Sequence, residues 1–496
     1  MTASTHVPAR RGSWKLEPDA SRVVARLFVP GQEGFDQEDS RTTAVLARVL
    51  ALDDDDAQAA LDDVVSRMGA RHRDLSATFR RHASDVADRL DPGDRLSDTR
   101  RLLVGATFTS EYAIEGAALC NPSIVAHPDQ SGMTAGALRF VMSVRCIGEG
   151  HRSSIGFRTG TIDASGQATV EPPSPFATTG TSTATRLEAA AFHGELHRLG
   201  GEGENADYVF GALGPHFSRD ELELRLQDLR DNRMTRRHTE QTIRLLRTIA
   251  DRHYEVEFDR ETALSERVLW PAMAAERHGM EDARFVAFTD DDGDCSYLAT
   301  YTAYDGSHIS QQLLDTRDFR TFRSTPIVGD AAANKGMALF PRRVHGRFAA
   351  LSRCDRETNS IAFSDDLRHW PASSRFQVPL HAWEVLQLGN CGPPIETDAG
   401  WLVVTHGVGP MRTYSLGAIL LDLDDPTVVV GALAHPLLTP AVDERDGYVP
   451  NVVYSCGSLV HEDVFVLPYG FGDRAIGIAT VSLPELLTAL TTQKPR

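Results

Sequence analysis

Short apolar strands alternate with polar turns along much of the chain. Leading strands begin near residues 297, 347, 401 and 464, and an earlier one begins near 138. Each is followed by a polar turn and a second strand, as in CSYLATYTAYDG and then HISQQLLDT. A repeat of roughly fifty residues is typical of small antiparallel sheets arranged around an axis. The pattern predicts a mainly β fold, a five-bladed β-propeller with added α-helical segments, in preference to a β-sandwich.

Two stretches with apolar residues at helical spacing lie outside this series. Residues 38–91 are expected to be helical, with the acidic run 53–56 at a helix start, where negative charge is favoured. In the second stretch, 185–255, Ser218 and Glu221 form a capping box before an amphipathic run. Strand-like sequence is expected to begin near residue 103. The predicted organisation is an N-terminal arm and helical segment (1–100), a first propeller part (101–184), a helical insertion (185–265) and the remaining propeller blades (266–496).

Composition and charge narrow the functional classes. The formal net charge of -18 over 496 residues argues against a nucleic-acid-binding surface. The six cysteines show no CxxC spacing, so we expect reduced thiols and no metal site. The N-terminus lacks the apolar stretch of a secretory signal, and no window approaches the roughly 18 apolar residues of a membrane span. These features predict a cytoplasmic protein without a membrane partner.

Polar residues at the ends of the expected strands are candidates for chemistry. Asp282 lies in the segment Glu281-Asp282-Ala283-Arg284, and a carboxylate beside an arginine can stay ionised or serve as an acid once a ligand desolvates it. A surface turn is the plainer interpretation of such an acidic pair. Cationic and aromatic side chains that could bind an anion occur later in the chain. They are Lys335, His406, Arg412 and Tyr414.

A set of short motifs occurs in a fixed order. They are NPSIVAHPDQ, EDAR, YTAYDG, NKGMALFPRRVHGRFAALSR, GPPIET, THGVG, GYVPNVVYSCG and YGFGD. Together they resemble glycoside hydrolase family 130, which consists of β-mannoside phosphorylases and some β-mannosidases on a five-bladed propeller. The resemblance covers about residues 100–170 and 280–490 and leaves both helical stretches outside.

The resemblance implies inverting phosphorolysis of β-mannosides, with release of α-mannose 1-phosphate. Asp282 takes the place of the general acid, although Ala283 stands where many members have proline. Inorganic phosphate is the expected nucleophile and co-substrate, and no cofactor is expected. The matching phosphate-binding positions are Lys335, His406 and Tyr414, with Arg412 as a neighbour. The expected substrate-binding residues are Asn121, Arg145, Arg353, Tyr448 and Asp473.

One departure from the family pattern concerns the segment after YTAY, where many phosphorylases have an arginine. Here it reads DGSHISQQ. The place would have to be filled by Gln311, Gln312 or His308, or the charge supplied by Arg353 or Arg412.

Three functions stay open at this point. The leading one is a β-mannoside phosphorylase, because no acidic residue replaces the cations near 406–414. An inverting β-mannosidase is the second, with Glu444, Asp446 or another carboxylate activating water. A carbohydrate-binding propeller without turnover is the third. The expected partners are a β-mannoside oligosaccharide and phosphate, and the amphipathic helices leave open whether the chain forms a homo-oligomer.

Overall fold

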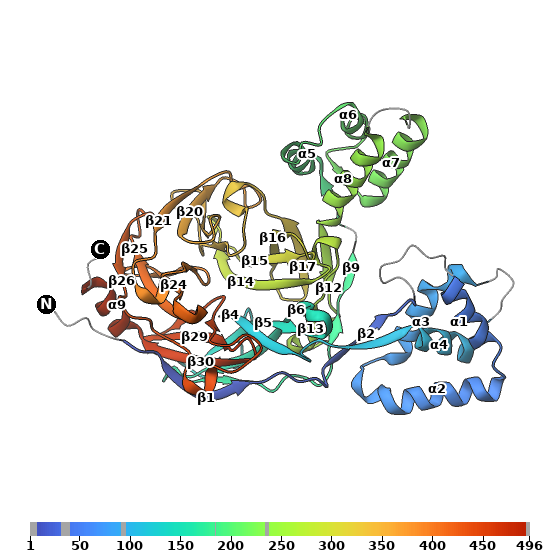
Figure 1. Cartoon of the computed structure of the whole chain (residues 1–496), viewed down its shortest axis with the longest axis horizontal. Helices are drawn as coiled ribbons and strands as arrows, with labels where there is room; N and C mark the ends of the chain where they lie inside the picture. The colour runs from blue at the N-terminus through green and yellow to red at the C-terminus, as the bar shows by residue number, and fades with distance from the viewer. Residues whose placement is uncertain (1–6, 31–39, 91–95, 184, 234–237, 493–496) are drawn as a thin grey trace. The chain divides into compact units, whose positions relative to one another are not determined.

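The computed structural model describes residues 7–30, 40–90, 96–183, 185–233 and 238–492. The chain forms two compact units (Figure 1). The larger unit comprises Met1–Pro18, Ala117–Pro173 and Thr179–Arg496, and the smaller comprises Asp19–Gly116 and Ser174–Thr178. The fold is mainly β, with helices concentrated in the smaller unit and in one segment of the larger. No helix in the described part of the chain has both the length and the apolar character needed to cross a membrane.

The largest sheet of the larger unit has twelve strands and contains two antiparallel ladders. Ladder 1 consists of β4 (Ala118–Ala126), β5 (Leu138–Ile147), β6 (Ser153–Ile162) and β7 (Ala168–Val170). Ladder 2 consists of β14 (Gly279–Thr289), β15 (Cys295–Tyr304), β16 (Ile309–Thr316) and β17 (Thr321–Pro326), extended by β12 (Tyr254–Glu257) and β9 (Thr181–Thr183). The short strands β8 (Thr178–Thr179) and β13 (Arg267–Leu269) complete the sheet. The two ladders join where β14 runs parallel to β6, at the residue pair Gly279 and Ser153.

Three further antiparallel ladders follow in chain order. Ladder 3 contains β18 (Ala338–Leu339), β19 (Phe348–Ser352), β20 (Asn359–Ser364) and β21 (Ser373–Gln377). Ladder 4 contains β22 (Gln387–Asn390), β23 (Ile395–Thr397), β24 (Gly400–Val408), β25 (Tyr414–Leu421) and β26 (Val429–Ala432). Ladder 5 contains β27 (Val453–Tyr454), β28 (Leu459–His461), β29 (Val464–Phe471), β30 (Ala475–Ser482) and the N-terminal strand β1 (Arg10–Leu16). The leading strands β5, β15, β19, β24 and β29 begin within a few residues of the predicted positions.

The cores of the larger unit lie between consecutive ladders. One core joins ladders 1 and 2 through Phe157 and Phe285, and the next joins ladders 2 and 3 through residues such as Val286 and Leu339. Equivalent cores join ladder 3 to ladder 4 and ladder 4 to ladder 5. A fifth core contains Phe140 of ladder 1 together with side chains of ladder 5, so the series of contacts returns to its start.

Helices occupy the segment between ladders 1 and 2. They are α5 (Ala189–Arg198), α6 (Glu204–Phe210), α7 (Arg219–Arg233) and α8 (Thr239–Asp251), accompanied by the short strands β10 (Leu187–Glu188) and β11 (His216–Phe217). Their shared core includes Leu196, Leu226 and Ile243. The predicted capping box is confirmed, because the Glu221 N–H donates to Ser218 Oγ at 3.1 Å and the Ser218 N–H donates to Glu221 Oε2 at 2.6 Å. The C-terminal helix α9 (Leu483–Thr492) packs on the core between ladders 4 and 5.

Short 3₁₀ helices lie in the connections. They are η1 (Gly69–Arg71), η2 (Ala87–Arg89), η3 (Glu149–His151), η4 (Leu264–Glu266), η5 (Ala274–Glu276), η6 (Asp330–Ala332), η7 (Ala382–Glu384), η8 (Pro410–Arg412) and η9 (Val442–Glu444). Of these, η3 and η8 matter for the site described below.

In its described residues, the smaller unit holds the strand pair β2 (Val23–Leu27) and β3 (Thr109–Ala113) and four helices. These are α1 (Ser40–Leu50), α2 (Asp54–Met68), α3 (Leu75–Asp85) and α4 (Asp98–Thr107). The acidic helix start is confirmed, because Asp53 Oδ1 accepts the Asp56 N–H at 2.7 Å. The expectation of a strand from residue 103 is wrong, because residues 98–107 form α4, whose N-cap is Ser97. Leu103 and Val104 are buried in the core shared by the helices. An apolar run this short cannot distinguish strand from helix by periodicity.

Close helix packing at Gly105 gives a test of this unit. A Cβ at Gly105 of α4 would lie 1.8 Å from the Phe79 carbonyl oxygen of α3. We expect Gly105→Ala to destabilise the smaller unit by about 1–3 kcal/mol, because overpacking outweighs the helix propensity that alanine gains. Gly69→Ala is the control, since its Cβ would meet Val65 Cγ1 at 3.8 Å. Hydrogen exchange of α3 and α4 peptides in the full chain measures the effect, and unchanged protection in the Gly105 variant would contradict it.

Candidate active site

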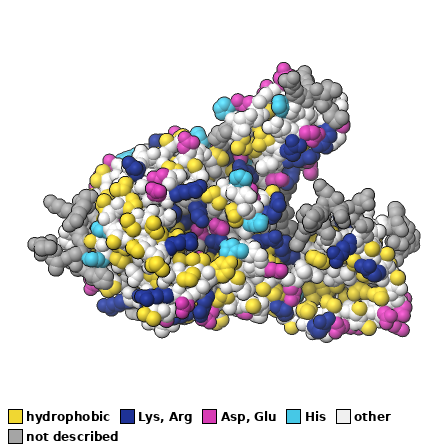
Figure 2. Space-filling model, viewed as in Figure 1, with side chains coloured by type: hydrophobic (Ala, Val, Ile, Leu, Met, Phe, Trp, Pro, Cys, Tyr) yellow, Lys and Arg dark blue, Asp and Glu magenta, His cyan; other side chains and the backbone are white. Residues whose placement is uncertain are grey.

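A cavity of about 550 Å³ is lined by side chains from all five ladders or the loops beside them. In Figure 2, basic, acidic and histidine side chains gather toward the middle of the visible face of the larger unit. All of the predicted site residues except Tyr448 line the cavity. They are Asn121, Arg145, Asp282, Lys335, Arg353, His406, Arg412, Tyr414 and Asp473. Tyr448 is 52% exposed and hydrogen-bonds to His151, although its neighbour Val449 is part of the lining.

Left-handed backbone conformations occur at five lining residues, which are Asn121, Asp282, Asp473, Arg356 and Arg412. The φ angles are 50° at Asn121, 57° at Asp282 and 44° at Asp473. At the first two the strand pairing is irregular, between Cys120 and Ser123 in β4 and between Glu281 and Arg284 in β14. A bulge re-aims side chains, and strain of this kind persists only where the surrounding structure enforces it. The ladders thus turn the amide of Asn121 and the carboxylate of Asp282 toward each other, and the two hydrogen-bond.

Asp282 is a buried carboxylate held among cations. Arg145 Nη1 lies 3.4 Å from its Oδ1, and Arg284 Nη2 lies 3.8 Å from its Oδ2. Burial alone would raise the pKa of Asp282, but the charges of Arg145, Arg284 and Lys335 outweigh burial and lower the pKa to about 2. The carboxyl group is therefore ionised at neutral pH when nothing is bound.

Glu281 connects the two sides of the cavity, and the sequence-based site set did not include it. Its Oε1 accepts from Arg145 Nη2 at 2.7 Å, and its Oε2 lies 3.8 Å from Lys335 Nζ. Glu281 is 9% exposed, whereas 45% of the Lys335 side chain is exposed. The carboxylate therefore fixes Arg145 firmly and leaves the ammonium group of Lys335 accessible to a ligand.

The pKa of Asp473 is shifted in the opposite direction from that of Asp282. Burial raises the pKa of Asp473 to about 6, and the negative charge of Asp282 acts in the same direction. Two carboxyl groups in one cavity thus have widely separated proton affinities. This separation is a common property of sites that perform acid–base chemistry.

The other side of the cavity offers hydrogen-bond donors without acceptors. Arg353 is 6% exposed, and its Nη1 donates to the Tyr454 hydroxyl at 3.4 Å. Burial, together with the charges of Arg353 and Arg284, holds the pKa of His406 well below its usual value, so the imidazole is neutral. His406 stacks on Tyr414 with ring centres 6.1 Å apart. Within the described residues, Arg353 Nε and His406 Nε2 are buried and find no hydrogen-bond partner. An anion bound here would accept from the Arg353 Nε–H group, and also from His406 in the tautomer that carries the proton on Nε2.

The structure also adds Tyr454 and Arg284 to the predicted set. Arg284 Nη2 donates to the Tyr454 hydroxyl at 3.1 Å, so this hydroxyl receives hydrogen bonds from two arginines. Both residues belong to motifs recognised in the sequence, GYVPNVVYSCG and EDAR. The motifs could therefore have identified them.

The sequence analysis named residues that could replace the missing arginine and carboxylates that could activate water. Only some of these residues line the cavity. Arg353 and Arg412 line the cavity, whereas Gln311, Gln312 and His308 are not among the lining residues. The candidate base Glu444 also lies outside. Its Oε1 accepts from Arg11 Nε at 3.0 Å and from the Tyr469 hydroxyl at 2.7 Å, so it serves to attach β1 to ladder 5. Asp446, the other named candidate, is not a lining residue either.

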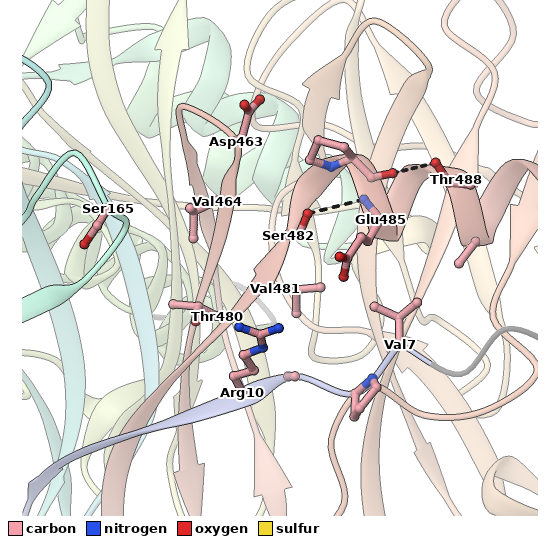
Figure 3. Close-up of a pocket in the computed structure, with 14 residues that line it drawn as sticks. Val7, Arg10, Ser165, Asp463, Val464, Thr480, Val481, Ser482, Glu485 and Thr488 are labelled. Atoms are coloured by element: carbon pink, nitrogen blue, oxygen red, sulfur yellow. Dashed lines mark hydrogen bonds between the residues drawn. The ribbon is translucent and has the colours of Figure 1, made fainter.

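A second cavity, of about 880 Å³, lies beside β1, β30 and α9 (Figure 3). Its charged lining residues, Arg10, Asp463 and Glu485, are exposed to solvent. Exposed charges interact weakly because solvent screens them. The chemistry is therefore assigned to the smaller cavity, despite its size.

Comparisons with known proteins identify the family. Residues 237–492, just over half of the chain, match the sequence model of a family described as beta-1,4-mannooligosaccharide phosphorylase. The chain belongs to glycoside hydrolase family 130. The match begins within the helical segment and covers ladders 2 to 5, apart from β1 and β9.

Individual members of family 130 are similar over part of the chain. The 1,2-beta-oligomannan phosphorylase of Thermoanaerobacter sp. (strain X514) is 34% identical over 217 residues, which is 42% of this chain and 71% of that protein. The beta-1,4-mannooligosaccharide phosphorylase of Ruminococcus albus is 32% identical over 184 residues, 35% of this chain and 55% of that protein. The solved structure of the Listeria innocua beta-1,2-mannobiose phosphorylase has a TM-score of 0.45 at 19% identity, covering 77% of this chain and 94% of that one.

The raised pKa of Asp473 predicts a pH-dependent stability. Its protonated form is favoured in the folded state, so its contribution to stability is complete below about pH 4 and is lost as pH rises through about 6. Asp473→Asn keeps a neutral side chain at all pH values. We expect the free energy of unfolding of the variant, relative to wild type, to increase by about 3 kcal/mol between pH 4 and 7 and to stay level above pH 7.

Chemical denaturation at a series of pH values measures this difference. Asp463→Asn, at an exposed position, is the control and should show no such rise. A relative stability of the Asp473 variant that is independent of pH would show that the carboxyl group titrates normally in the folded protein.

Proposed function

We propose that the protein is an inverting β-mannoside phosphorylase in which Asp282 is the general acid and inorganic phosphate is the nucleophile. The observation that carries the proposal is one cavity in which the ionised carboxylate of Asp282 occurs together with a set of donors suited to an anion, while the pKa of the second lining carboxyl group, Asp473, is raised. The similarity to a 1,2-beta-oligomannan phosphorylase and to a beta-1,4-mannooligosaccharide phosphorylase supports the substrate class.

The phosphate would lie against Lys335, Arg353 and His406, with Tyr414 and Arg412 beside it. Two cations and a neutral imidazole N–H provide the charge and the hydrogen bonds that a phosphate dianion needs. Arg353 supplies the charge for which the segment after YTAY has no arginine. Asn121, Arg145 and Asp473 would hold the sugar ring on the Asp282 side of the cavity.

Phosphate binding also explains how a carboxyl group with so low a proton affinity can act as an acid. The positive charges of Arg145, Arg284 and Lys335 hold the pKa of Asp282 at about 2 in the empty site. A dianion drawn against Lys335 would offset part of that charge and raise the pKa of Asp282. The acid would then become protonated when the nucleophile is in place.

The proposed reaction is a single displacement at the anomeric carbon. A phosphate oxygen forms the new bond while the glycosidic C–O bond breaks. The departing oxygen keeps the bonding electrons and takes the proton of Asp282. The products are α-mannose 1-phosphate and a sugar shortened by one unit, and Asp282 is left as a carboxylate that regains its proton from solvent.

We further propose that ladders 1 to 5 are the blades of a five-bladed propeller, with the segment 185–265 as a helical insertion. The support is the series of five cores, each shared by two ladders, that returns from ladder 5 to ladder 1. The pairing of β1 with β30 would close the ring by placing the N-terminal strand in the last blade.

The central test is the dependence of turnover on phosphate. We expect β-1,2- or β-1,4-mannobiose to yield α-mannose 1-phosphate with phosphate present, and negligible free mannose without it, as measured by ³¹P NMR and ion chromatography. Asp282→Asn should lower kcat by about 10²- to 10⁴-fold, the usual contribution of a general acid. Equal sugar release with and without phosphate would favour the β-mannosidase, and binding without turnover would favour a carbohydrate-binding protein.

Lys335 tests the phosphate site. Lys335→Ala should raise the KM for phosphate by about tenfold, because one charge-assisted contact to an anion is lost. The KM for the mannoside should change little. Lys15→Ala is a matched control, since the Lys15 side chain is 43% exposed against 45% for Lys335 and also pairs with a carboxylate, that of Asp443. An unchanged KM for phosphate would place the anion elsewhere.

A further inference from the structure

Two aromatic side chains outside the cavity lining form a stacked pair on the surface of the larger unit. The ring centres of His151 and Tyr448 are 5.2 Å apart with 16° between the ring planes. His151 Nδ1 and the Tyr448 hydroxyl hydrogen-bond at 2.7 Å. Both side chains are exposed, Tyr448 to 52%.

Each residue of the pair is close in the chain to a residue that lines the cavity. His151 ends η3, which follows β5 a few residues after Arg145. Its imidazole has its pKa lowered by burial and then by the charge of Arg145, so the two side chains are within electrostatic reach. Tyr448 precedes Val449, which lines the cavity. The two aromatic rings thus come from loops that flank the sugar side of the site.

The loop that carries Tyr448 is fixed in place. The Val449 N–H donates to the Gly472 carbonyl at 3.0 Å, directly before Asp473. Gly447 packs so closely that a Cβ there would lie 2.2 Å from the same carbonyl oxygen. Only glycine permits this approach. The position of Tyr448 is therefore tied to that of the carboxyl group of Asp473.

We propose that His151 and Tyr448 form an aromatic platform that binds the sugar ring beyond the scissile bond, the ring that leaves in phosphorolysis and enters as acceptor in the reverse reaction. In a single displacement the leaving group departs on the side away from the nucleophile. Arg353 contacts Tyr454 and the ring of His406 stacks on Tyr414, whereas Arg145 is the cavity cation whose charge acts on His151. In the proposal the leaving sugar emerges past Arg145 toward the pair. Exposed aromatic faces suit the C–H face of a pyranose ring.

This inference rests on the proposed function, and the reverse reaction separates the two sugar positions. With α-mannose 1-phosphate as donor and mannose as acceptor, Tyr448→Ala should raise the KM for the acceptor about three- to tenfold. The KM for α-mannose 1-phosphate and, in the forward direction, the KM for phosphate should stay within twofold. Tyr448→Phe keeps the ring and should behave like wild type, and His151→Ala should show a smaller increase than Tyr448→Ala.

One control variant and the outcomes that would contradict the proposal complete this test. Phe28→Ala removes an aromatic side chain that is 46% exposed in the smaller unit, and should leave every constant unchanged. An unchanged acceptor KM in Tyr448→Ala would overturn the platform. So would an equal rise in the KM for α-mannose 1-phosphate, or a Tyr448→Phe variant as impaired as the alanine variant, since the hydroxyl and not the ring would then matter.

Sugar binding by the aromatic platform can also be tested in a protein that does not catalyse phosphorolysis. If wild type shows no phosphate-dependent turnover, calorimetric binding of β-mannobiose to wild type and Tyr448→Ala measures the same contact. A loss of affinity of three- to tenfold supports the platform and leaves only the reaction to be revised. Equal affinities of the two proteins overturn the platform.

Discussion

The site depends on the compensation of one buried negative charge. Asp282 is 6% exposed, and an unpaired carboxylate at such a position would cost several kcal/mol. Arg145 and Arg284 provide the compensation, and each is itself held by other groups: Arg145 by Glu281 at 2.7 Å, and Arg284 by the Cys391 carbonyl at 2.8 Å. These partners come from different ladders. The charge pattern can therefore exist only where the ladders pack together, and the cavity is a product of the whole larger unit.

The same compensation separates the roles of the polar groups. Because Arg145 and Arg284 are committed to Asp282, Lys335 and Arg353 are among the lining cations that keep donors for a ligand. The buried Arg353 Nε and His406 Nε2 have no partner among the described residues, which is an unfavourable arrangement unless an anion completes it. A hydroxyl oxygen of a neutral sugar can accept from such donors, but an anion gains the stronger, charge-assisted hydrogen bond to the guanidinium group. This is the physical reason to favour phosphate as the nucleophile over water.

The sequence predicted the parts of the molecule that depend on local pattern. The strand repeats, the capping box at Ser218 and the ordered motifs identified the ladders, the helical segment and most of the cavity lining. The failures have a common cause. The run Leu102-Leu103-Val104 is too short for its period to be read, and the positions of Glu281 and Tyr454 become meaningful only when distances between ladders are known. Charge compensation and pKa shifts are likewise properties of side chains far apart in sequence, so no local signal contains them.

Strain and close packing show how the site is kept rigid. Left-handed φ angles at Asn121, Asp282 and Asp473 are each unfavourable for a residue with a Cβ, yet all three occur where a polar group must face the cavity. Their persistence requires cores on both sides of each ladder, which the closed series of apolar contacts supplies. An open arrangement of the ladders would let these strands relax to regular pairing, and a one-residue shift would turn the side chains to the opposite face. Packing between successive ladders and orientation of the polar groups in the cavity are therefore one constraint.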